Sequence, residues 1–423
     1  MYKMNTVQKA RLALSSLGLY RPLLEKPVVA AFARVLETAH GGELRGFLDA
    51  YGAFISLLAP ARATTGVLDF SGVLRTLVEQ NDSLFARQAA GGQVEQAVRA
   101  AAARDLAALS MALDLSPREI KAAASASFDD DDSVAFIDSL PDFITGGAFS
   151  AEETERFHAT HGCGVFASFG AFKWQRGVSG DSSLFGISAP DPVRLSQLKG
   201  YDYERNIVLE NTSNFLDGTS ANNMLLYGDR GTGKSSTVKA VFNEFRGRGL
   251  RIIEVSKDCI VEFARIIERI GSVPLKFIIF IDDLSFSDGD DNYSALKAVL
   301  EGGVAARPRN TVIYATSNRR HFVKESFSER DSEVHSGDAM QEKLSLADRF
   351  GITVTFTSPD QRLYFNIVRT LAADRGLDVD GAQLERGAAQ WALRYNGRSP
   401  RTATQYIDWV AGRIKNGLPL DDF

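Results

Sequence analysis

One segment of eight residues constrains this chain more than any other. Residues 228–235 read Gly-Asp-Arg-Gly-Thr-Gly-Lys-Ser and satisfy the phosphate-binding pattern G-x-x-x-x-G-K-[ST] at every fixed position. The apolar segment 224–227 before it predicts a buried strand, and residues 236–242 after it carry apolar side chains at helical spacing. A glycine-rich loop between a strand and a helix predicts an α/β fold that binds a phosphorylated ligand.

The residue types of this loop suit a nucleoside triphosphate with its metal ion. Glycines let the backbone N–H groups surround phosphate oxygens, and the following helix directs its positive end toward them. We expect Lys234 to reach the β- and γ-phosphates of ATP and Ser235 to bind Mg²⁺. The residues expected to hold the nucleotide are Gly228, Asp229, Arg230, Gly231, Thr232, Gly233, Lys234, Ser235 and Ser236.

Two further apolar segments end in polar side chains. Asp282 and Asp283 follow residues 276–281, and Asn318 ends the segment that begins at Thr311. The carboxyl ends of parallel strands meet at one edge of a sheet, so we expect these side chains near the phosphates. Asp282 is expected to serve Mg²⁺ through its water shell, and Asp283 to orient and deprotonate the attacking water. Asn318 would hold water or the γ-phosphate, or would instead cap the following turn.

The composition is that of an ordinary globular protein. The chain has 423 residues, of which 44% are hydrophobic, and its net charge is −5. No stretch approaches the roughly 18 apolar residues of a membrane span, and the N-terminus does not resemble a signal peptide. Two cysteines, Cys163 and Cys259, fit a reducing compartment. We therefore predict a cytoplasmic protein without a membrane partner.

The region up to about residue 127 shows mainly helical periodicity. Apolar residues recur at helical spacing across 44–58 and 94–113, and residues 116–119 read as a capping box with proline at the first helical position. Four aspartates at 129–132 predict a solvated loop. Because the polar residues of this region form no recognisable catalytic motif, we expect a scaffold or partner-docking domain.

The loop-like stretch 180–192 predicts a domain boundary. We expect residues 1–190 to form a mostly helical N-terminal domain, which ends in a glycine- and aromatic-rich strand pair or connector. Residues 191–357 should form the nucleotide-binding core and residues 358–423 a helical lid. In the core, five apolar strands alternate with helices, which predicts a parallel five-stranded sheet flanked by helices.

Together these motifs resemble the AAA+ ATPases, over about residues 191–423. The resemblance rests on the phosphate loop, the Asp282-Asp283 pair, Asn318, the segment Asp348-Arg349-Phe350 and the helical lid. More narrowly, four segments resemble the bacterial group labelled domain of unknown function 815 (DUF815), whose substrate is unassigned. These segments are residues 221–228, 282–286, 315–321 and 345–351.

The resemblance implies further site residues. Arg349 matches the arginine finger that one subunit offers to its neighbour's γ-phosphate, and Arg401 matches the lid arginine of the nucleotide's own subunit. A guanidinium group suits both roles, although each arginine could instead form a surface or interface ion pair. By position alone, Tyr201 is a candidate to contact the adenine, with Leu195 and Leu198. A homo-oligomer is also implied, with a ring as one form.

Two departures from the AAA+ pattern affect the expected activity. Asp283 occupies the position where many members carry glutamate. The side chain expected to act as base is therefore one methylene shorter, and the sequence does not fix the rate of ATP hydrolysis. Residues 256–262 lead straight into a helix, whereas protein-threading members place an aromatic and glycine-containing loop there. Threading of a polypeptide is therefore disfavoured.

Three functions remain open from the sequence. The first is ATP hydrolysis with Mg²⁺ that drives remodelling of an unidentified macromolecular partner. The second is a slow ATP-dependent switch or loader whose helical N-terminal domain binds a protein partner. The third is a nucleic-acid remodeller, which the net charge supports weakly. The basic clusters that would serve it are Arg246, Arg248 and Arg251, or Arg319, Arg320 and Lys324.

Overall fold

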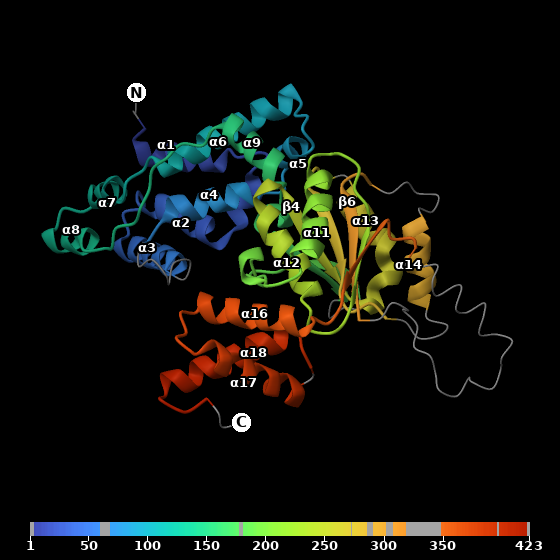
Figure 1. Cartoon of the computed structure of the whole chain (residues 1–423). Helices are drawn as coiled ribbons and strands as arrows, with labels where there is room; N and C mark the ends of the chain where they lie inside the picture. The colour runs from blue at the N-terminus through green and yellow to red at the C-terminus, as the bar shows by residue number, and fades with distance from the viewer. Residues whose placement is uncertain are drawn as a thin grey trace. The chain divides into compact units, whose positions relative to one another are not determined.

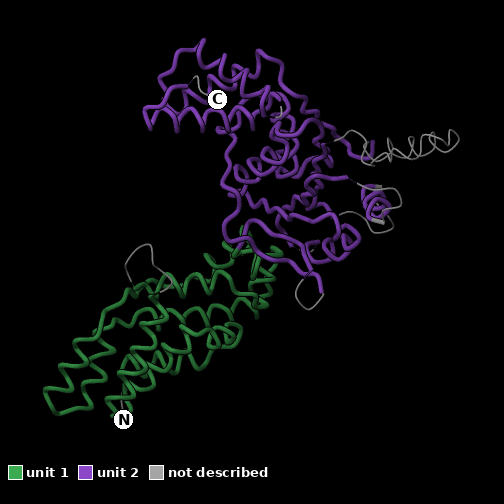
Figure 2. Tube along the Cα trace, turned by 90° about the horizontal axis from the view of Figure 1, so that it is seen from below, with its two compact units in different colours: residues 1–168 green, residues 169–423 purple. Residues whose placement is uncertain are grey.

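The chain divides into two compact units, residues 1–168 and 169–423 (Figure 2). The computed structural model describes residues 4–59, 68–176, 181–271, 273–285, 291–301, 308–318, 348–395 and 397–420. The expected domain boundary lay near residue 190, but residues 171–186 form strands that pair within the second unit. The first unit therefore ends earlier than the sequence suggested.

The first unit is helical, as predicted. Its helices are α1 (Thr6–Ser15), η1 (Arg21–Glu25), α2 (Pro27–Thr38), α3 (Leu44–Leu58), α4 (Phe70–Glu79), α5 (Leu84–Ala90), α6 (Gln96–Leu113), α7 (Pro117–Ser125), α8 (Asp131–Asp138), α9 (Ala151–His161) and α10 (Val165–Ser168). Its core contains a cluster of aromatic rings, with Phe32 and Phe70 4.3 Å apart and Phe54 and Phe143 5.0 Å apart between ring centroids. Such pairs add to the burial energy of the rings themselves.

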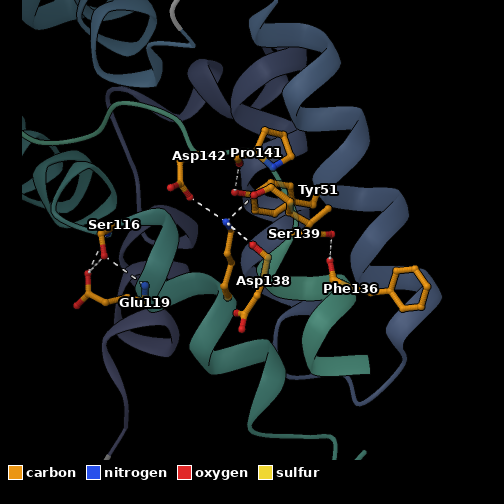
Figure 3. Close-up of polar contacts among 10 residues, drawn as sticks. Tyr51, Ser116, Glu119, Phe136, Asp138, Ser139, Pro141 and Asp142 are labelled. Carbon is orange, nitrogen blue, oxygen red and sulfur yellow. Dashed lines mark hydrogen bonds and ion pairs between the residues drawn. The ribbon is translucent and has the colours of Figure 1, made fainter. Parts of the chain in front are cut away.

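A buried lysine fastens the segment that follows α8. The amine of Lys121, on α7, donates to the Leu140 carbonyl at 2.6 Å and to the Asp142 carboxylate at 2.8 Å (Figure 3). The Tyr51 hydroxyl donates to the neighbouring Pro141 carbonyl at 2.9 Å. These bonds satisfy backbone carbonyls in a segment that has no regular structure of its own.

The prediction of a solvated loop at residues 129–132 is wrong. The Asp130 side chain accepts a hydrogen bond from the Ser133 N–H and caps α8, and Asp131 and Asp132 lie in the first turn of that helix. Carboxylates are favoured there because the amino end of a helix carries partial positive charge. The acidic run therefore begins a helix.

The second unit is built on a seven-stranded sheet with the strand order β2-β1-β4-β5-β6-β3-β7. The strands are β1 (Ala171–Arg176), β2 (Ser182–Gly186), β3 (Met224–Gly228), β4 (Leu250–Val255), β5 (Lys276–Ile281), β6 (Thr311–Ser317) and β7 (Ile352–Phe356). All neighbouring pairs are parallel except β1 and β2. The five predicted strands are present, and the expected number of five is corrected to seven because β1 adds to β4 and β2 folds back on β1.

Helices flank this sheet and form the predicted lid. Those of the core are η3 (Leu195–Gln197), α11 (Asp202–Leu216), α12 (Lys234–Phe245), η4 (Arg246–Arg248), η5 (Lys257–Glu262), α13 (Phe263–Gly271) and α14 (Asp291–Glu301). As predicted, η5 and α13 directly follow β4. The lid helices α16 (Gln361–Asp374), α17 (Gly381–Arg394) and α18 (Pro400–Lys415) pack around their own apolar core (Figure 1). No helix in the described part of the chain is long and apolar enough to cross a membrane.

Candidate functional site

The phosphate loop lies at the carboxyl edge of the sheet. It connects the end of β3 at Gly228 to the start of α12 at Lys234, as the motif predicted. Gly228, Gly231 and Gly233 have φ angles of 132°, 77° and 97°, a region that side chains other than glycine rarely adopt. A Cβ atom at Gly228 would also overlap the Phe356 carbonyl of β7. The loop therefore needs glycine here for its turn and for the close approach of two strands.

The Lys234 amine is buried within the loop. It donates to the carbonyls of Gly228 at 2.9 Å and Asp229 at 2.7 Å, and to Oδ1 of Asn318 at 3.1 Å. Burial lowers the pKa of Lys234, while three nearby aspartates act in the opposite direction. The amine is thus held beside the loop atoms that would surround a phosphate group.

Asp282 joins the end of β5 to the phosphate loop and to β6. Its Oδ1 accepts hydrogen bonds from the Ser235 hydroxyl and the Thr316 hydroxyl, each at 2.6 Å. A hydroxyl and a carboxylate in direct contact present the oxygen atoms that Mg²⁺ prefers. The structure thus brings Ser235 and Asp282 together, and this donor set fits the expected ion. Their binding of Mg²⁺ stays a prediction.

Asp283 and Asn318 form the next contact along the sheet edge. Nδ2 of Asn318 donates to Oδ1 of Asp283 at 2.6 Å, while the amide oxygen of Asn318 accepts from Lys234. Asp283 has a φ angle of 52°, which is uncommon for a residue with a side chain. Asn318 therefore bridges the lysine of the phosphate loop and the carboxylate that was expected to act as base.

These side chains line one cavity of about 630 Å³ between the sheet edge and the lid. This volume lies in the range typical of small-molecule sites, roughly 300 to 1,000 Å³. The predicted residues that line it are Arg230, Gly231, Thr232, Gly233, Lys234, Ser235, Ser236, Asp282, Asp283, Asn318 and Arg401. Leu198, named above as a candidate to contact the adenine, also lines it. Other lining residues from the segment before α11 and from the lid are Gln197, Lys199, Ile367, Leu371, Thr404 and Gln405.

Arg401 belongs to the lid and lies close to the phosphate loop. It is near the start of α18, and its backbone N–H donates to the Gly231 carbonyl at 3.2 Å. A Cβ atom at Gly231 would meet the Ser399 hydroxyl at 2.9 Å. Glycine at 231 thus lets the lid approach the loop, and Arg401 borders the cavity from that side, where the resemblance to AAA+ proteins implied it.

Tyr201 packs against the segment that leads to the lid. It is outside the set of residues that line the cavity, its ring lies 5.4 Å from that of Phe356, and its hydroxyl donates to the Thr357 carbonyl at 2.5 Å. Burial raises the pKa of Tyr201, so the hydroxyl remains a donor. The side chain thus contacts the linker that leads to the lid, and its contact with the adenine stays a prediction.

Gly228, Asp229 and Arg349 also lie outside the set of lining residues. The Asp229 carboxylate accepts a hydrogen bond from the Ser358 N–H at 2.6 Å, and this bond lowers the pKa of Asp229. Arg349 is half-buried and comes three residues before β7. Its expected role as an arginine finger for the γ-phosphate in a neighbouring subunit stays a prediction.

Thr316 is a buried residue of this site that the sequence analysis did not single out. It lies on β6 two residues before Asn318, is 2% exposed and lines the cavity. The available signal was the run of polar side chains at the end of an apolar strand, within which only Asn318 was given a role. Gln197, Lys199 and Gln405 were missed because no motif marks them.

Of the basic cluster at residues 246–251, Arg246 and Arg248 are exposed, whereas Arg251 is buried. Arg251 is 5% exposed, and burial lowers its pKa to about 10. Arg248 pairs with Asp217 at 2.6 Å. The second expected cluster, at residues 319–324, lies outside the described part of the chain. The described residues therefore add no support to a nucleic-acid partner.

Comparison with known proteins identifies a family and distant structural likenesses. A family model described as "Protein of unknown function (DUF815)" matches residues 167–414, more than half of the chain. No curated protein sequence matches the chain. Among solved structures, a single-residue variant of RuvB from Thermotoga maritima has 16% sequence identity and a TM-score of 0.38, over 53% of this chain and 66% of that one. The match therefore spans slightly less than two thirds of the RuvB chain.

DnaA from Aquifex aeolicus, solved with bound AMPPCP, is similarly distant. It has 17% sequence identity and a TM-score of 0.37, over 53% of this chain and 67% of that one. The sheet order and helical lid described above agree with the AAA+ resemblance that the motifs carried.

Proposed function

The chain belongs to the DUF815 family, and from this premise and the geometry of its cavity we propose that it binds ATP with Mg²⁺ and hydrolyses the ATP to ADP and phosphate. One observation carries the proposal: Lys234, the adjacent pair Asp282 and Asp283, and Arg401 come from three separate segments of the chain and line a single cavity. A lysine, two carboxylates and an arginine are the groups that phosphoryl transfer to water requires.

Each residue has a defined part in the proposed reaction. Lys234 would exchange its carbonyl partners for β- and γ-phosphate oxygens, and Arg401 would stabilise charge that develops on the phosphates. Asp283 would orient the attacking water and accept its proton, with Asn318 beside it. Bound Mg²⁺ would supply positive charge that stabilises the phosphates. Ser235 and Asp282 would hold that ion.

The proposal extends to an assembly of identical subunits. Arg349 is not among the residues that line the cavity of its own chain, which is compatible with service to a neighbouring chain. We propose a homo-oligomer, with a ring as one form, that acts in the cytoplasm on an unidentified macromolecular partner. The domain division into helical region, ATPase core and lid belongs to the same proposal.

Replacement of Lys234 tests the hydrolysis itself. Lys234→Ala should reduce Mg²⁺-dependent phosphate release by at least about 100-fold, because the buried amine is lost from the phosphate site. Lys415→Ala is a matched control, since Lys415 is exposed at the end of α18 and does not line the cavity. Turnover that survives Lys234→Ala would reject the proposal.

A slow switch is the second candidate, and one observation favours it. Oδ1 of Asp283 already accepts a hydrogen bond from Asn318, so only one carboxylate oxygen of Asp283 is left for a water molecule. In this case ATP binding, rather than turnover, would control how the helical unit 1–168 binds a protein partner. Tight ATP binding with negligible hydrolysis would support the switch. Rapid hydrolysis that Lys234→Ala abolishes would count against it.

A further inference from the structure

A buried threonine hydroxyl connects the two carboxylate residues of the site. The hydroxyl of Thr316 accepts a hydrogen bond from the Asp283 N–H at 2.9 Å and lies 2.6 Å from Oδ1 of Asp282. An amide can only donate and a hydroxyl has a single proton, so that proton is directed to Asp282. The Thr316 hydroxyl therefore contacts the backbone of Asp283 and the side chain of Asp282.

The strand end that contains Thr316 also holds the turn between the carboxylates. The Thr316 carbonyl accepts from the Leu284 N–H at 2.7 Å, and the Ser317 hydroxyl donates to the Leu284 carbonyl at 2.9 Å. Asp283 lies in this turn with its φ angle of 52°. A side chain disfavours this backbone conformation, so surrounding contacts must maintain it. Residues 316 and 317 provide those contacts.

From this geometry we propose that Thr316 is a positioning residue that sets the orientation of Asp282 toward the metal ion and of Asp283 toward the attacking water. The inference rests on the proposed ATP hydrolysis, which supplies the reaction. Ser235 and Thr316 now share Oδ1 of Asp282 as their acceptor. When Ser235 turns to the metal ion, Thr316 remains as the donor that fixes the Asp282 carboxylate. Partners of this kind commonly determine metal affinity.

Two substitutions of Thr316 distinguish the effect of its hydroxyl from the effect of its packing. Valine has nearly the shape of threonine but no hydroxyl, so Thr316→Val leaves the Asp283 N–H without this acceptor and Asp282 without this donor. Thr316→Ser keeps the hydroxyl and removes only a methyl group. Thr311→Val makes the same exchange on the same strand, at a residue that is also 2% exposed but lies at the opposite end of β6.

The experiment measures metal dependence and turnover separately. Binding of a fluorescent, non-hydrolysable ATP analogue is titrated with Mg²⁺, and kcat and KM for ATP are measured. Without Mg²⁺, Thr316→Val should bind the analogue as the wild type does. The Mg²⁺ concentration that produces half of the maximal change in analogue binding should be at least about tenfold higher for Thr316→Val. Its kcat should fall by at least about tenfold with little change in KM, whereas Thr316→Ser should restore both quantities to within about threefold of the wild type.

Two results would overturn the inference. One is a Thr316→Val protein with the Mg²⁺ requirement and kcat of the wild type, and the other is a Thr316→Ser protein as impaired as Thr316→Val, which would indicate packing alone. If Thr316→Val does not fold, Thr316→Ala is compared with Thr316→Ser in the same titrations. A wild-type protein that binds the analogue with Mg²⁺ but never hydrolyses ATP would refute the proposed hydrolysis, while the Mg²⁺ titrations would still decide the role of Thr316.

Discussion

Asp283 combines two properties with opposite consequences for catalysis. Its side chain is one methylene shorter than the glutamate common in AAA+ proteins, which reduces its reach toward a water molecule. Its backbone is fixed by Thr316 at a φ angle of 52°, which restricts the positions that the carboxylate can take. A short base can be effective if it is held in place, because proton transfer depends on distance and orientation.

Asp283→Asn tests the role of this carboxylate with little change in shape. Asparagine tolerates the left-handed backbone region, so the turn should be retained. We expect ATP affinity to stay within about threefold of the wild type and kcat to fall by at least about 100-fold, because the amide cannot accept the proton. Phosphate release and analogue binding are measured in parallel. An Asp283→Asn protein with wild-type turnover would show that the base lies elsewhere.

The sequence predicted about half of the residues that meet in the cavity, but not the bonds among them. The phosphate loop, Asp282, Asp283 and Asn318 follow strands with clear apolar patterns, and parallel strands bring their carboxyl ends together. Thr316 was missed because a polar residue at a strand end has many uses. The contact between the rings of Tyr201 and Phe356 was not predicted, because the position of Tyr201 relative to the motif does not reveal it.

At the scale of elements, the linker to the lid is bonded to the phosphate loop. The Asp229 N–H donates to the Phe356 carbonyl at 2.9 Å, and its carboxylate accepts from the Ser358 N–H at 2.6 Å. The Tyr201 hydroxyl donates to the intervening Thr357 carbonyl at 2.5 Å. A change of the loop on binding phosphate would therefore reach the first residues of the lid directly.

Tyr201→Phe distinguishes the bond between Tyr201 and the lid linker from a contact of Tyr201 with the adenine of ATP. The substitution keeps the ring and removes one hydrogen bond, so the free energy of unfolding should fall by about 1 kcal/mol. ATP affinity should be unchanged, because Tyr201 does not line the cavity. Denaturant unfolding and analogue binding provide the two measurements. A tenfold loss of affinity would instead favour the base contact that the resemblance implied.

The end of α9 introduces a pH dependence into the helical unit. His158 is fully buried, its Nδ1 lies 2.9 Å from the Gly162 carbonyl, and its Nε2 has no hydrogen-bond partner among the described residues. Burial lowers the pKa of His158, so the unfolded chain takes up a proton at a higher pH than the folded one. The free energy of unfolding should therefore fall as the pH drops below about 6.5.

His158→Asn tests this dependence, since asparagine can keep a donor near Nδ1 but does not titrate. Thermal unfolding of the full chain is followed between about pH 7.5 and 5.5, a range that the ordinary histidine pKa spans. The wild type should lose more stability than the variant over this range. Equal losses in the two proteins would assign the effect to other groups, such as His40.

At the scale of the whole molecule, element order was more predictable than the division into units. Helical periodicity identified the first unit, and the five central strands followed from their apolar runs. A strand pair or connector was expected in the glycine- and aromatic-rich segment that contains the start of β1, whereas β2 lies in the stretch 180–192 that was predicted to be loop-like. The pairing of β1 with β4 joins segments that are far apart along the chain, a contact that local patterns do not encode.

The proposed role of Arg349 is to complete the site of a neighbouring chain, so its test concerns the whole assembly. If a neighbouring chain completes each site, the ATPase rate per chain should rise with protein concentration. Arg349→Ala should retain ATP binding and lose hydrolysis by about 1,000-fold, as removal of an arginine finger does. Arg386→Ala is a suitable control because Arg386 lies on α17 and does not line the cavity.

Mixing two inactive proteins distinguishes a shared site from a general loss of structure. Lys234→Ala cannot hold the phosphates in its own loop but still offers Arg349, whereas Arg349→Ala has an intact loop. In a mixed oligomer some cavities would contain Lys234 from one chain beside Arg349 from the next, so hydrolysis should partly return on mixing. A mixture as inactive as its components, from variants shown to assemble together, would place the action of Arg349 within its own chain, because only exchange between chains can restore the site.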